Sequence, residues 1–220
     1  MSNTDRKACR LYVVTPPTID LSSFPDQLAQ AFDGGDIGAL QLRLKNASDD
    51  DILRAAELLI PICHEHEAAF IMNDSPELAK QSGADGVHIG QDDGSIKAAR
   101  AIIGPGPIIG VSCHDSRHLA MEAGEEGADY VAFGAFYPTQ SKSPEALARW
   151  GTPEPDILTW WQEYMVLPCV AIGGITPANC TPLVKAGADF IAVITAVWNH
   201  AQGPKKAVAE FNQAIERALT

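Results

Sequence analysis

The sequence predicts a single-domain (β/α)8 barrel, the TIM-barrel class of α/β fold, over residues 1–220. Short apolar runs alternate with helical patterns almost from end to end, which is typical of a parallel sheet built from βα units. A chain of 220 residues that is 46% hydrophobic is also long enough to bury the core of one such barrel. Right-handed crossovers repeated along the chain then close the sheet on itself.

Eight apolar runs are expected to form the strands. They are Leu11–Thr15, Ala39–Leu44, Ala69–Met72, Gly86–Ile89, Ile108–Ser112, Tyr130–Phe133, Cys169–Ile172 and Phe190–Ile194. An internal Gly-Ala-Asp repeat ends at Asp85, Asp129 and Asp189, directly before three of these strands. A helix C-terminal glycine followed by a turn explains this pattern, so we expect the three aspartates to stabilise the N-terminal end of the barrel.

Charge and cysteine content limit the classes of partner and compartment. A formal net charge of −12 argues against broad binding to nucleic acid or anionic membranes, which requires a basic surface. No apolar run reaches the roughly 18–20 residues that span a bilayer, and the N-terminus lacks the apolar core of a secretory signal. Five cysteines without paired spacing are typical of buried free thiols in a reducing cytosol. We therefore expect a cytoplasmic protein, and small phosphorylated ligands stay compatible with its charge.

Two groups of residues invite a functional interpretation that the sequence does not favour. The segment Cys63–His66 has the composition of a metal site, but it ends a helical pattern, where residues two apart point to different sides. A helix end with exposed histidines is therefore expected. Trp160, Trp161 and Trp198 are assigned to packing on outer helices or to a subunit interface, which leaves a homodimer open.

The second expected strand carries two cations on one face. Chemistry in a (β/α)8 barrel lies at the C-terminal ends of the strands. Period-2 alternation places Gln41, Arg43 and Lys45 on the face opposite the leucines, and so toward the barrel mouth. Arginine and lysine there suit a polyanion, because the guanidinium grips phosphate oxygens bidentately and the ammonium is a compact charge. Solvated cations on an amphipathic strand are the alternative.

Carboxylates follow the next two strands. The third strand ends in Asn73-Asp74, and the fourth is followed by Gly90, Gln91, Asp92 and Asp93. Adjacent strands lie about 4.8 Å apart, so Asp74 and Asp93 can share one hard cation. Mg²⁺ prefers one or two carboxylates together with phosphate oxygens. Both aspartates could instead cap helices, but that role leaves the neighbouring cations unexplained, so we favour the magnesium site.

The last two strands end in a pattern typical of phosphate sites. Gly173-Gly174 follows the seventh strand, and Ile194-Thr195 ends the eighth. Backbone amides of a glycine pair and of helix N-termini at these two positions form the common phosphate site of such barrels. A metal-assisted anion site and a separate backbone site at one mouth fit two phosphorylated substrates better than one.

The remaining candidates come from the fourth, fifth and sixth strands. Alternation turns His88 inward just below the mouth, although a satisfied core histidine is the alternative, and Ser112 offers a hydroxyl at the rim. The segment 140–155 is longer than an ordinary βα loop and is expected to form a lid, with a floppy insertion as the alternative. Three further polar side chains accompany this lid-like loop, namely Thr139, Ser141 and Lys142.

Six motifs occur in order across Gln41–Thr176: Q-L-R-x-K, N-D, H-I-G-Q-x-D, G-V-S-x-H, Y-P-T-x-S-K and I-G-G-I-T. Together they resemble the thiamine-phosphate synthase (thiamine-phosphate pyrophosphorylase) family over nearly the whole chain. The resemblance implies a Mg²⁺-dependent transferase that joins 4-amino-2-methyl-5-hydroxymethylpyrimidine diphosphate to a thiazole monophosphate. Its products would be thiamine monophosphate and pyrophosphate. The diphosphate would leave first, and the thiazole nitrogen would then attack a pyrimidine methylene cation.

The resemblance also implies a role for each candidate residue. Mg²⁺ would lie on Asp74 and Asp93. The diphosphate would lie on Arg43, Lys45 and Lys142, and the pyrimidine would meet Gln41, Asn73, His88 and Ser112. The thiazole substrate would meet Thr139 and Ser141, with its phosphate on Gly173 or Gly174 and on the backbone at Ile194 and Thr195. The residues implied to be catalytic are Arg43, Lys45, Ser112 and Lys142.

Three alternatives are left open. A paralogue of the thiazole tautomerase type shares the barrel but resembles the N-D and G-Q-x-D motifs poorly. Another phosphate-binding barrel enzyme, such as a sugar-phosphate isomerase, needs an acid–base pair that no residues at the mouth obviously supply. A non-catalytic protein that senses a thiamine precursor or product would bind its ligand without turnover.

Overall fold

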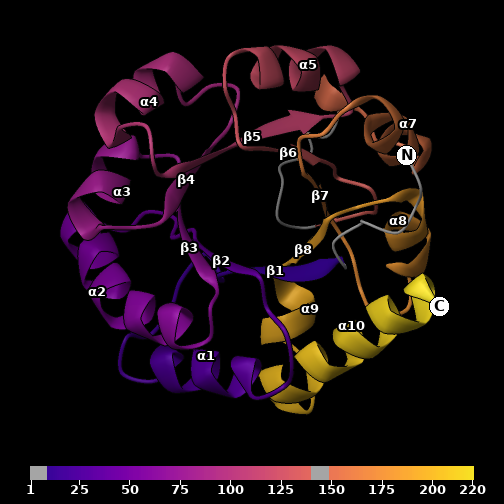
Figure 1. Ribbon diagram of the computed structural model, residues 1–220. Helices are drawn as coiled ribbons and strands as arrows, with labels where there is room; N and C mark the ends of the chain where they lie inside the picture. Colours follow the sequence, from indigo (N-terminus) through magenta and orange to yellow (C-terminus); the bar gives the residue numbers. More distant parts are fainter. Residues whose placement is uncertain (1–8, 140–148) are drawn as a thin grey trace.

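The computed structural model describes residues 9–139 and 149–220, and Figure 1 shows a closed ring of strands surrounded by helices. The strands are β1 (Arg10–Val14), β2 (Ala39–Leu42), β3 (Ala69–Asn73), β4 (Gly86–Ile89), β5 (Ile108–His114), β6 (Tyr130–Phe133), β7 (Cys169–Ile172) and β8 (Phe190–Val193). Each strand is parallel to the next, and β8 pairs with β1 to complete the barrel. The predicted (β/α)8 barrel is confirmed.

The helices form the outer layer. They are α1 (Phe24–Phe32), α2 (Asp49–Glu65), α3 (Pro76–Ser82), α4 (Ile96–Ile103), α5 (Arg117–Glu125), α7 (Asp156–Tyr164), α8 (Thr181–Ala186), α9 (Thr195–Trp198) and α10 (Gly203–Leu219). Four of them, α2 to α5, begin at a serine whose hydroxyl accepts a hydrogen bond from the backbone N–H three residues on. Because these serines cap the helices, the residues just before them belong to the loops at the barrel mouth.

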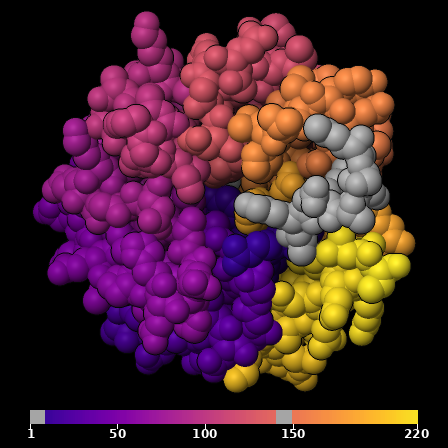
Figure 2. Space-filling model, in the orientation of Figure 1, coloured from indigo at the N-terminus to yellow at the C-terminus, as the bar shows by residue number. Residues whose placement is uncertain are grey.

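Alternation along the strands divides the core into two layers. The outward side chains, such as Leu40 and Phe70, pack with the helices in one large cluster. The inward side chains form a second, smaller cluster inside the barrel, which consists of Tyr12, Val14, Ala39, Ile71, Tyr130, Ala132, Val170 and Ala192. Many of these inward residues are small, and the space-filling view shows the ring hollowed near its centre (Figure 2). Small inward residues therefore leave room for a site inside the barrel.

The aspartates of the Gly-Ala-Asp repeat tie neighbouring strands together. The carboxylates of Asp85, Asp129 and Asp189 accept hydrogen bonds from the amides of Phe70, Ile109 and Cys169, at 2.7, 2.8 and 2.8 Å. Each acceptor lies in the turn that enters one strand, and each donor lies at the start of the preceding strand. These contacts give the three aspartates the stabilising role that the sequence predicts.

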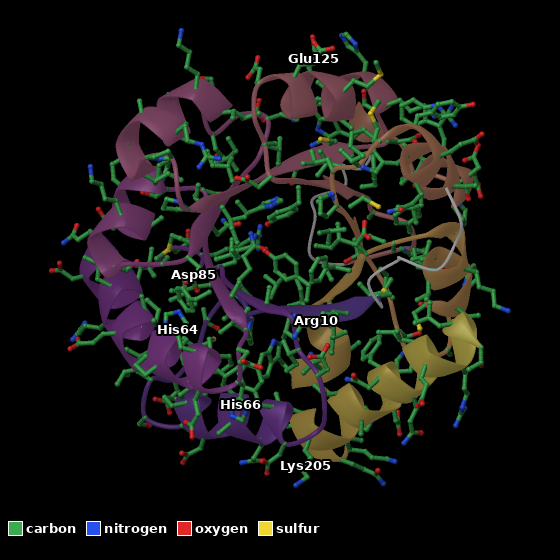
Figure 3. The ribbon with its side chains drawn as sticks, in the orientation of Figure 1. Arg10, His64, His66, Asp85, Glu125 and Lys205 are labelled. Carbon is green, nitrogen blue, oxygen red and sulfur yellow. The ribbon has the colours of Figure 1, made fainter. Side chains whose placement is uncertain are left out.

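The histidines of Cys63–His66 point in different directions. Nε2 of His64 lies 3.0 Å from Asp85, and Figure 3 shows both residues at the flank of the barrel. His66 instead stacks on Phe32, with ring centroids 4.4 Å apart, while Cys63 is fully buried. Within residues 9–139 and 149–220, no three His, Cys, Asp or Glu side chains gather into a metal-binding group. Over the same residues, no helix is both long and apolar enough to cross a membrane.

Strand β2 is shorter than predicted. It ends at Leu42 rather than Leu44, and the chain then leaves the sheet, where the amide of Lys45 donates to the carbonyl of Pro17 at 2.8 Å. Asn46 follows with a left-handed φ of 59°. Alternation of side chains therefore stops before Lys45, and its predicted place on the inner strand face is wrong, because that face requires a continuing strand.

Candidate active site

A cavity of about 290 Å³ lies at the C-terminal ends of the strands and reaches into the barrel. Twelve of the residues proposed from the sequence line it: Gln41, Arg43, Asn73, Asp74, His88, Asp93, Ser112, Thr139, Gly173, Gly174, Ile194 and Thr195. The side chain of Lys45 is exposed and is not part of the lining. Ser141 and Lys142 lie outside the described residues, as does most of the predicted lid-like loop. Seven of the eight strands therefore bring a predicted residue to one space.

Hydrogen bonds connect the lining residues of β2 to those of β3 and to the residue that follows β1. Gln41 is only 5% exposed, and its Nε2 donates to Oδ1 of Asn73 at 2.9 Å. The backbone amide of Arg43 donates to Oγ1 of Thr15, a buried side chain at the end of β1, also at 2.9 Å. These contacts fix the backbone on which the guanidinium is carried. Arg43 is thus held at the mouth beside the paired amides of Gln41 and Asn73.

Neither Asp74 nor Asp93 caps a helix, although helix capping was the alternative role for both. Ser75 caps α3 and Ser95 caps α4. The carboxylate of Asp93 instead accepts a hydrogen bond from the Gly90 amide at 2.8 Å, within the loop after β4. Asp74 has a left-handed φ of 64°, which is uncommon outside glycine and concentrates at functional sites. Neither carboxylate is therefore committed to a helix cap, and both line the cavity.

The carboxyl groups of Asp74 and Asp93 line the same cavity, and the charge of Asp93 acts on Asp74. Burial, and next the negative charge of Asp93, raise the pKa of Asp74 to about 6, while the Arg43 guanidinium acts in the opposite direction. A divalent cation between the carboxylates would remove this repulsion, and Mg²⁺ takes one or two carboxylates in sites that it shares with phosphate. The donor set therefore fits the predicted magnesium ion.

His88 occupies the centre of the inner wall. Its Nδ1 lies 2.9 Å from the hydroxyl of Tyr130, and its Nε2 lies 2.9 Å from Oγ of Ser112. The Tyr130 hydroxyl also lies 2.9 Å from that of Tyr12. His88 is therefore a hydrogen-bonded residue that also lines the cavity, so the two roles weighed for it from the sequence are compatible.

The two residues after β7 must be glycines, because the segment after β6 approaches them too closely for a side chain. Gly173 and Gly174 have φ values of 105° and 63°. A Cβ on Gly173 would lie 2.3 Å from that of Ala135, and one on Gly174 would lie 2.4 Å from the carbonyl oxygen of Pro138. Only glycine fits both the conformation and the space. The pair lets the segment after β6 lie directly against the loop after β7 at the cavity wall.

An aromatic stack lies beside the cavity where the described chain resumes at Arg149. The ring of Trp150 stacks on His114, a cavity-lining residue, with centroids 4.3 Å apart. The Arg149 guanidinium lies 4.4 Å from the Trp150 ring centroid and also pairs with Asp92 at 3.5 Å. Asp92 therefore faces the rim, whereas its neighbour Asp93 faces the cavity.

Comparison with known proteins identifies the family. The family described as thiamine monophosphate synthase matches residues 11–197. The chain belongs to this family. A thiamine-phosphate synthase from Rhodospirillum centenum is 57% identical over 207 residues, which cover 94% of this chain and 98% of the relative. One from Hyphomonas neptunium is 49% identical over 216 residues, 96% of each chain.

A solved structure supports the same assignment. Thiamine phosphate pyrophosphorylase from Pyrococcus furiosus matches with a TM-score of 0.83 and 32% identity, covering 96% of this chain and 97% of the other. Membership in the thiamine-phosphate synthase family makes the chain an enzyme, a transferase of thiamine biosynthesis. The resemblance inferred from the six motifs is confirmed.

Two tyrosines of the cavity were not predicted from the sequence. Tyr12 and Tyr130 both line it, yet neither stands at the C-terminal end of a strand, where the chemistry of such a barrel is expected. The same alternation that turned Gln41 and His88 inward could have found them, because both tyrosines lie on inward positions of β1 and β6.

Proposed function

We propose that this thiamine-phosphate synthase family member condenses hydroxymethylpyrimidine diphosphate with thiazole monophosphate and releases pyrophosphate in a Mg²⁺-dependent reaction. The observation that supports this most directly is that one cavity is lined by Arg43, by the Asp74–Asp93 pair and by Gly173-Gly174. The Arg43 guanidinium together with two carboxylates suits a diphosphate that carries a bound metal ion. The glycine pair suits a phosphate that is held by backbone amides. The two sites match two phosphorylated substrates.

Mg²⁺ would be held by Asp74 and Asp93. When bound, it would supply positive charge that neutralises the departing diphosphate. Arg43 would bind diphosphate oxygens, with Lys45 and Lys142 proposed to add charge from the loops after β2 and β6. Positive groups arranged before the reaction stabilise the leaving group without reorganisation, which is electrostatic preorganisation.

The remaining wall residues would hold the pyrimidine and protect the cation that forms when the diphosphate leaves. The polar group consists of Gln41, Asn73, His88 and Ser112, with Thr139 and Ser141 beside the thiazole. Val14, Ala132 and Val170 line the inner end of the cavity, and these apolar side chains would limit water near the reacting carbon. No side chain acts as a nucleophile, since the thiazole nitrogen attacks the pyrimidine carbon.

The test follows both products. Purified protein is mixed with both substrates and Mg²⁺, and pyrophosphate and thiamine monophosphate are measured. The proposal predicts activity that EDTA abolishes and that Asp93→Asn lowers by roughly 10²–10³, the usual cost of one lost charge-stabilising group. Asp92→Asn is the matched control, because Asp92 pairs with Arg149 at the rim and does not line the cavity.

Other outcomes would support the alternatives instead. Turnover of thiazole phosphate alone, without metal, would indicate a tautomerase-type activity. Saturable ligand binding without either product would indicate a sensor. Equal losses in Asp93→Asn and Asp92→Asn would show that the metal site is not where we place it.

We also propose a reducing, cytoplasmic setting. All five cysteines are free and buried. Burial raises the pKa of the Cys63 and Cys113 thiols to about 12, so both stay neutral and unreactive at neutral pH. The proposal predicts that an alkylating reagent modifies the native protein far more slowly than the urea-unfolded protein. Equal rates would contradict the burial of the thiols.

A further inference from the structure

A chain of hydrogen bonds crosses the barrel below the cavity mouth. It runs from the Tyr12 hydroxyl to that of Tyr130, from there to Nδ1 of His88, and from Nε2 of His88 to Oγ of Ser112, with each separation 2.9 Å. The tyrosines are only 4% and 8% exposed, whereas His88 and Ser112 are partly accessible. The chain thus links two buried phenols to a hydroxyl at the wall of the site.

A glycine in the intervening strand makes this chain possible. In the sheet, Gly110 of β5 pairs with His88 of β4 on one side and with Tyr130 of β6 on the other. A Cβ at this position would lie 1.9 Å from Cζ of Tyr130 and 2.3 Å from its hydroxyl oxygen. Because the middle strand has no side chain here, the Tyr130 ring extends across it to reach the imidazole. The strand arrangement therefore builds the contact between Tyr130 and His88.

The direction of the hydrogen bonds follows from counting protons. Burial raises the pKa of Tyr12 and Tyr130, so both phenols are neutral and each donates one proton. Among the described residues, Tyr130 is the hydrogen-bond partner of the Tyr12 hydroxyl, and the pair packs with apolar side chains such as Val14 and Val170 beside the cavity. If Tyr130 donated to Tyr12, the Tyr12 proton would lack a protein acceptor, which is costly in a buried site. Tyr12 therefore donates to Tyr130, and Tyr130 donates to His88.

This direction determines the state of the imidazole. Nδ1 accepts from Tyr130, so a neutral His88 carries its proton on Nε2 and donates it to Ser112. A protonated His88 would donate from Nδ1, so Tyr130 would have to accept there. Tyr130 would then donate to Tyr12, and the Tyr12 proton would again lack a protein acceptor. Once Ser112 accepts from His88, its own hydroxyl proton is available to the cavity. The strand end that carries Ser112 is held separately, because Gln91 Nε2 donates to the Ser112 carbonyl at 2.6 Å.

We propose that Tyr12 and Tyr130 are positioning residues that hold neutral His88 in its Nε2–H tautomer and thereby present the Ser112 hydroxyl as a hydrogen-bond donor to the substrate. The partner of that donor is an acceptor atom on the bound substrate, and this part rests on the proposed function. The tautomer itself concerns the free protein and is independent of any reaction.

Long-range ¹H–¹⁵N NMR of histidine-labelled, substrate-free protein tests the tautomer directly, with His88→Gln used to assign the signals. We expect the Nε2–H form at neutral pH. Tyr130→Phe should give a mixture of tautomers, and Tyr12→Phe should weaken the preference. Tyr137→Phe is the matched control, because its hydroxyl bonds the carbonyl of Asn179 outside the chain of hydrogen bonds, and it should change nothing. An Nδ1–H form or an imidazolium in the wild-type protein would overturn the inference.

Kinetics separate positioning from a merely structural role. Tyr130→Phe should lower kcat by about tenfold, the equivalent of one typical hydrogen bond, with little change in KM. On a Ser112→Ala background the same substitution should cost nothing further, because both act through one donor. Additive losses would overturn the inference. Absence of synthase activity in a protein with the expected tautomer would instead refute the proposed function and leave the tautomer assignment intact.

Discussion

Gly110→Ala is a substitution for which the structure predicts a large loss of stability from one added methyl group. Its Cβ would lie 1.9 Å from Cζ of Tyr130, whereas ordinary contact begins near 3.4 Å, so the ring must move by about 1.5 Å. The ring has little room to move, because Tyr12 packs edge-on against it at 6.1 Å and His88 stacks at 5.6 Å. Movement on this scale breaks the hydrogen bonds from Tyr130 to both neighbours.

The magnitude follows from two contributions. Overpacking a closed core costs roughly 1–3 kcal/mol. Each hydrogen bond lost inside the barrel adds about 0.5–1.5 kcal/mol. We therefore expect Gly110→Ala to lower the free energy of unfolding by about 2–6 kcal/mol, a large part of the 5–15 kcal/mol typical of a whole protein.

Urea denaturation at equilibrium measures this change. Gly106→Ala is the control, since no atom lies within 4 Å of a Cβ built there and the residue is exposed in the loop before β5. We expect that control to stay within about 0.5 kcal/mol of the wild-type protein. If Gly110→Ala also changed the free energy of unfolding by less than about 1 kcal/mol, the packing of Tyr130 across β5 would be refuted.

Three further predictions concern the acids and the caps. Asp74 has a folded pKa of about 6 against an ordinary 3.8, so its contribution to stability falls as pH rises through that range. Metal-free Asp74→Asn should therefore be more stable than the wild-type protein in urea at about pH 7.5 but not at about pH 4. Equal stability at the higher pH would contradict the destabilisation of the Asp74 carboxylate by burial and by the charge of Asp93. Ser95→Ala should lower the free energy of unfolding by about 1 kcal/mol through loss of the α4 cap, and no change would show that the cap is not needed. Asp129→Ala should lower it by about 1–3 kcal/mol, because the Ile109 amide loses its acceptor, while activity per folded molecule stays unchanged; a loss of activity would contradict its purely structural role.

The strands could be predicted from the sequence because they depend on local alternation of side chains. Most of the site could be predicted for the same reason. Alternation placed Gln41 and His88 on the inner face, and both line the cavity. The same rule failed at Lys45, since β2 ends at Leu42 and the backbone amide of Lys45 bonds to the carbonyl of Pro17 outside the sheet. Two roles for Asp74 stayed open from sequence, because aspartate and the adjacent Ser75 are both good helix caps. The folded backbone places the serine hydroxyl on the helix amide, which leaves the carboxylate at the mouth.

The sequence by itself determined that this chain closes into an eight-stranded barrel, which family it belongs to, and which polar residues follow the strands. These properties depend on residues that are near one another along the chain or that recur in ordered motifs. Only the tertiary structure decided which side chains meet inside the barrel. Tyr12 and Tyr130 stand 118 positions apart, and their contact with His88 depends on the pairing of three neighbouring strands and on a glycine in the middle one. Such a contact arises from the register of a closed sheet, which is set only when all the strands pack together.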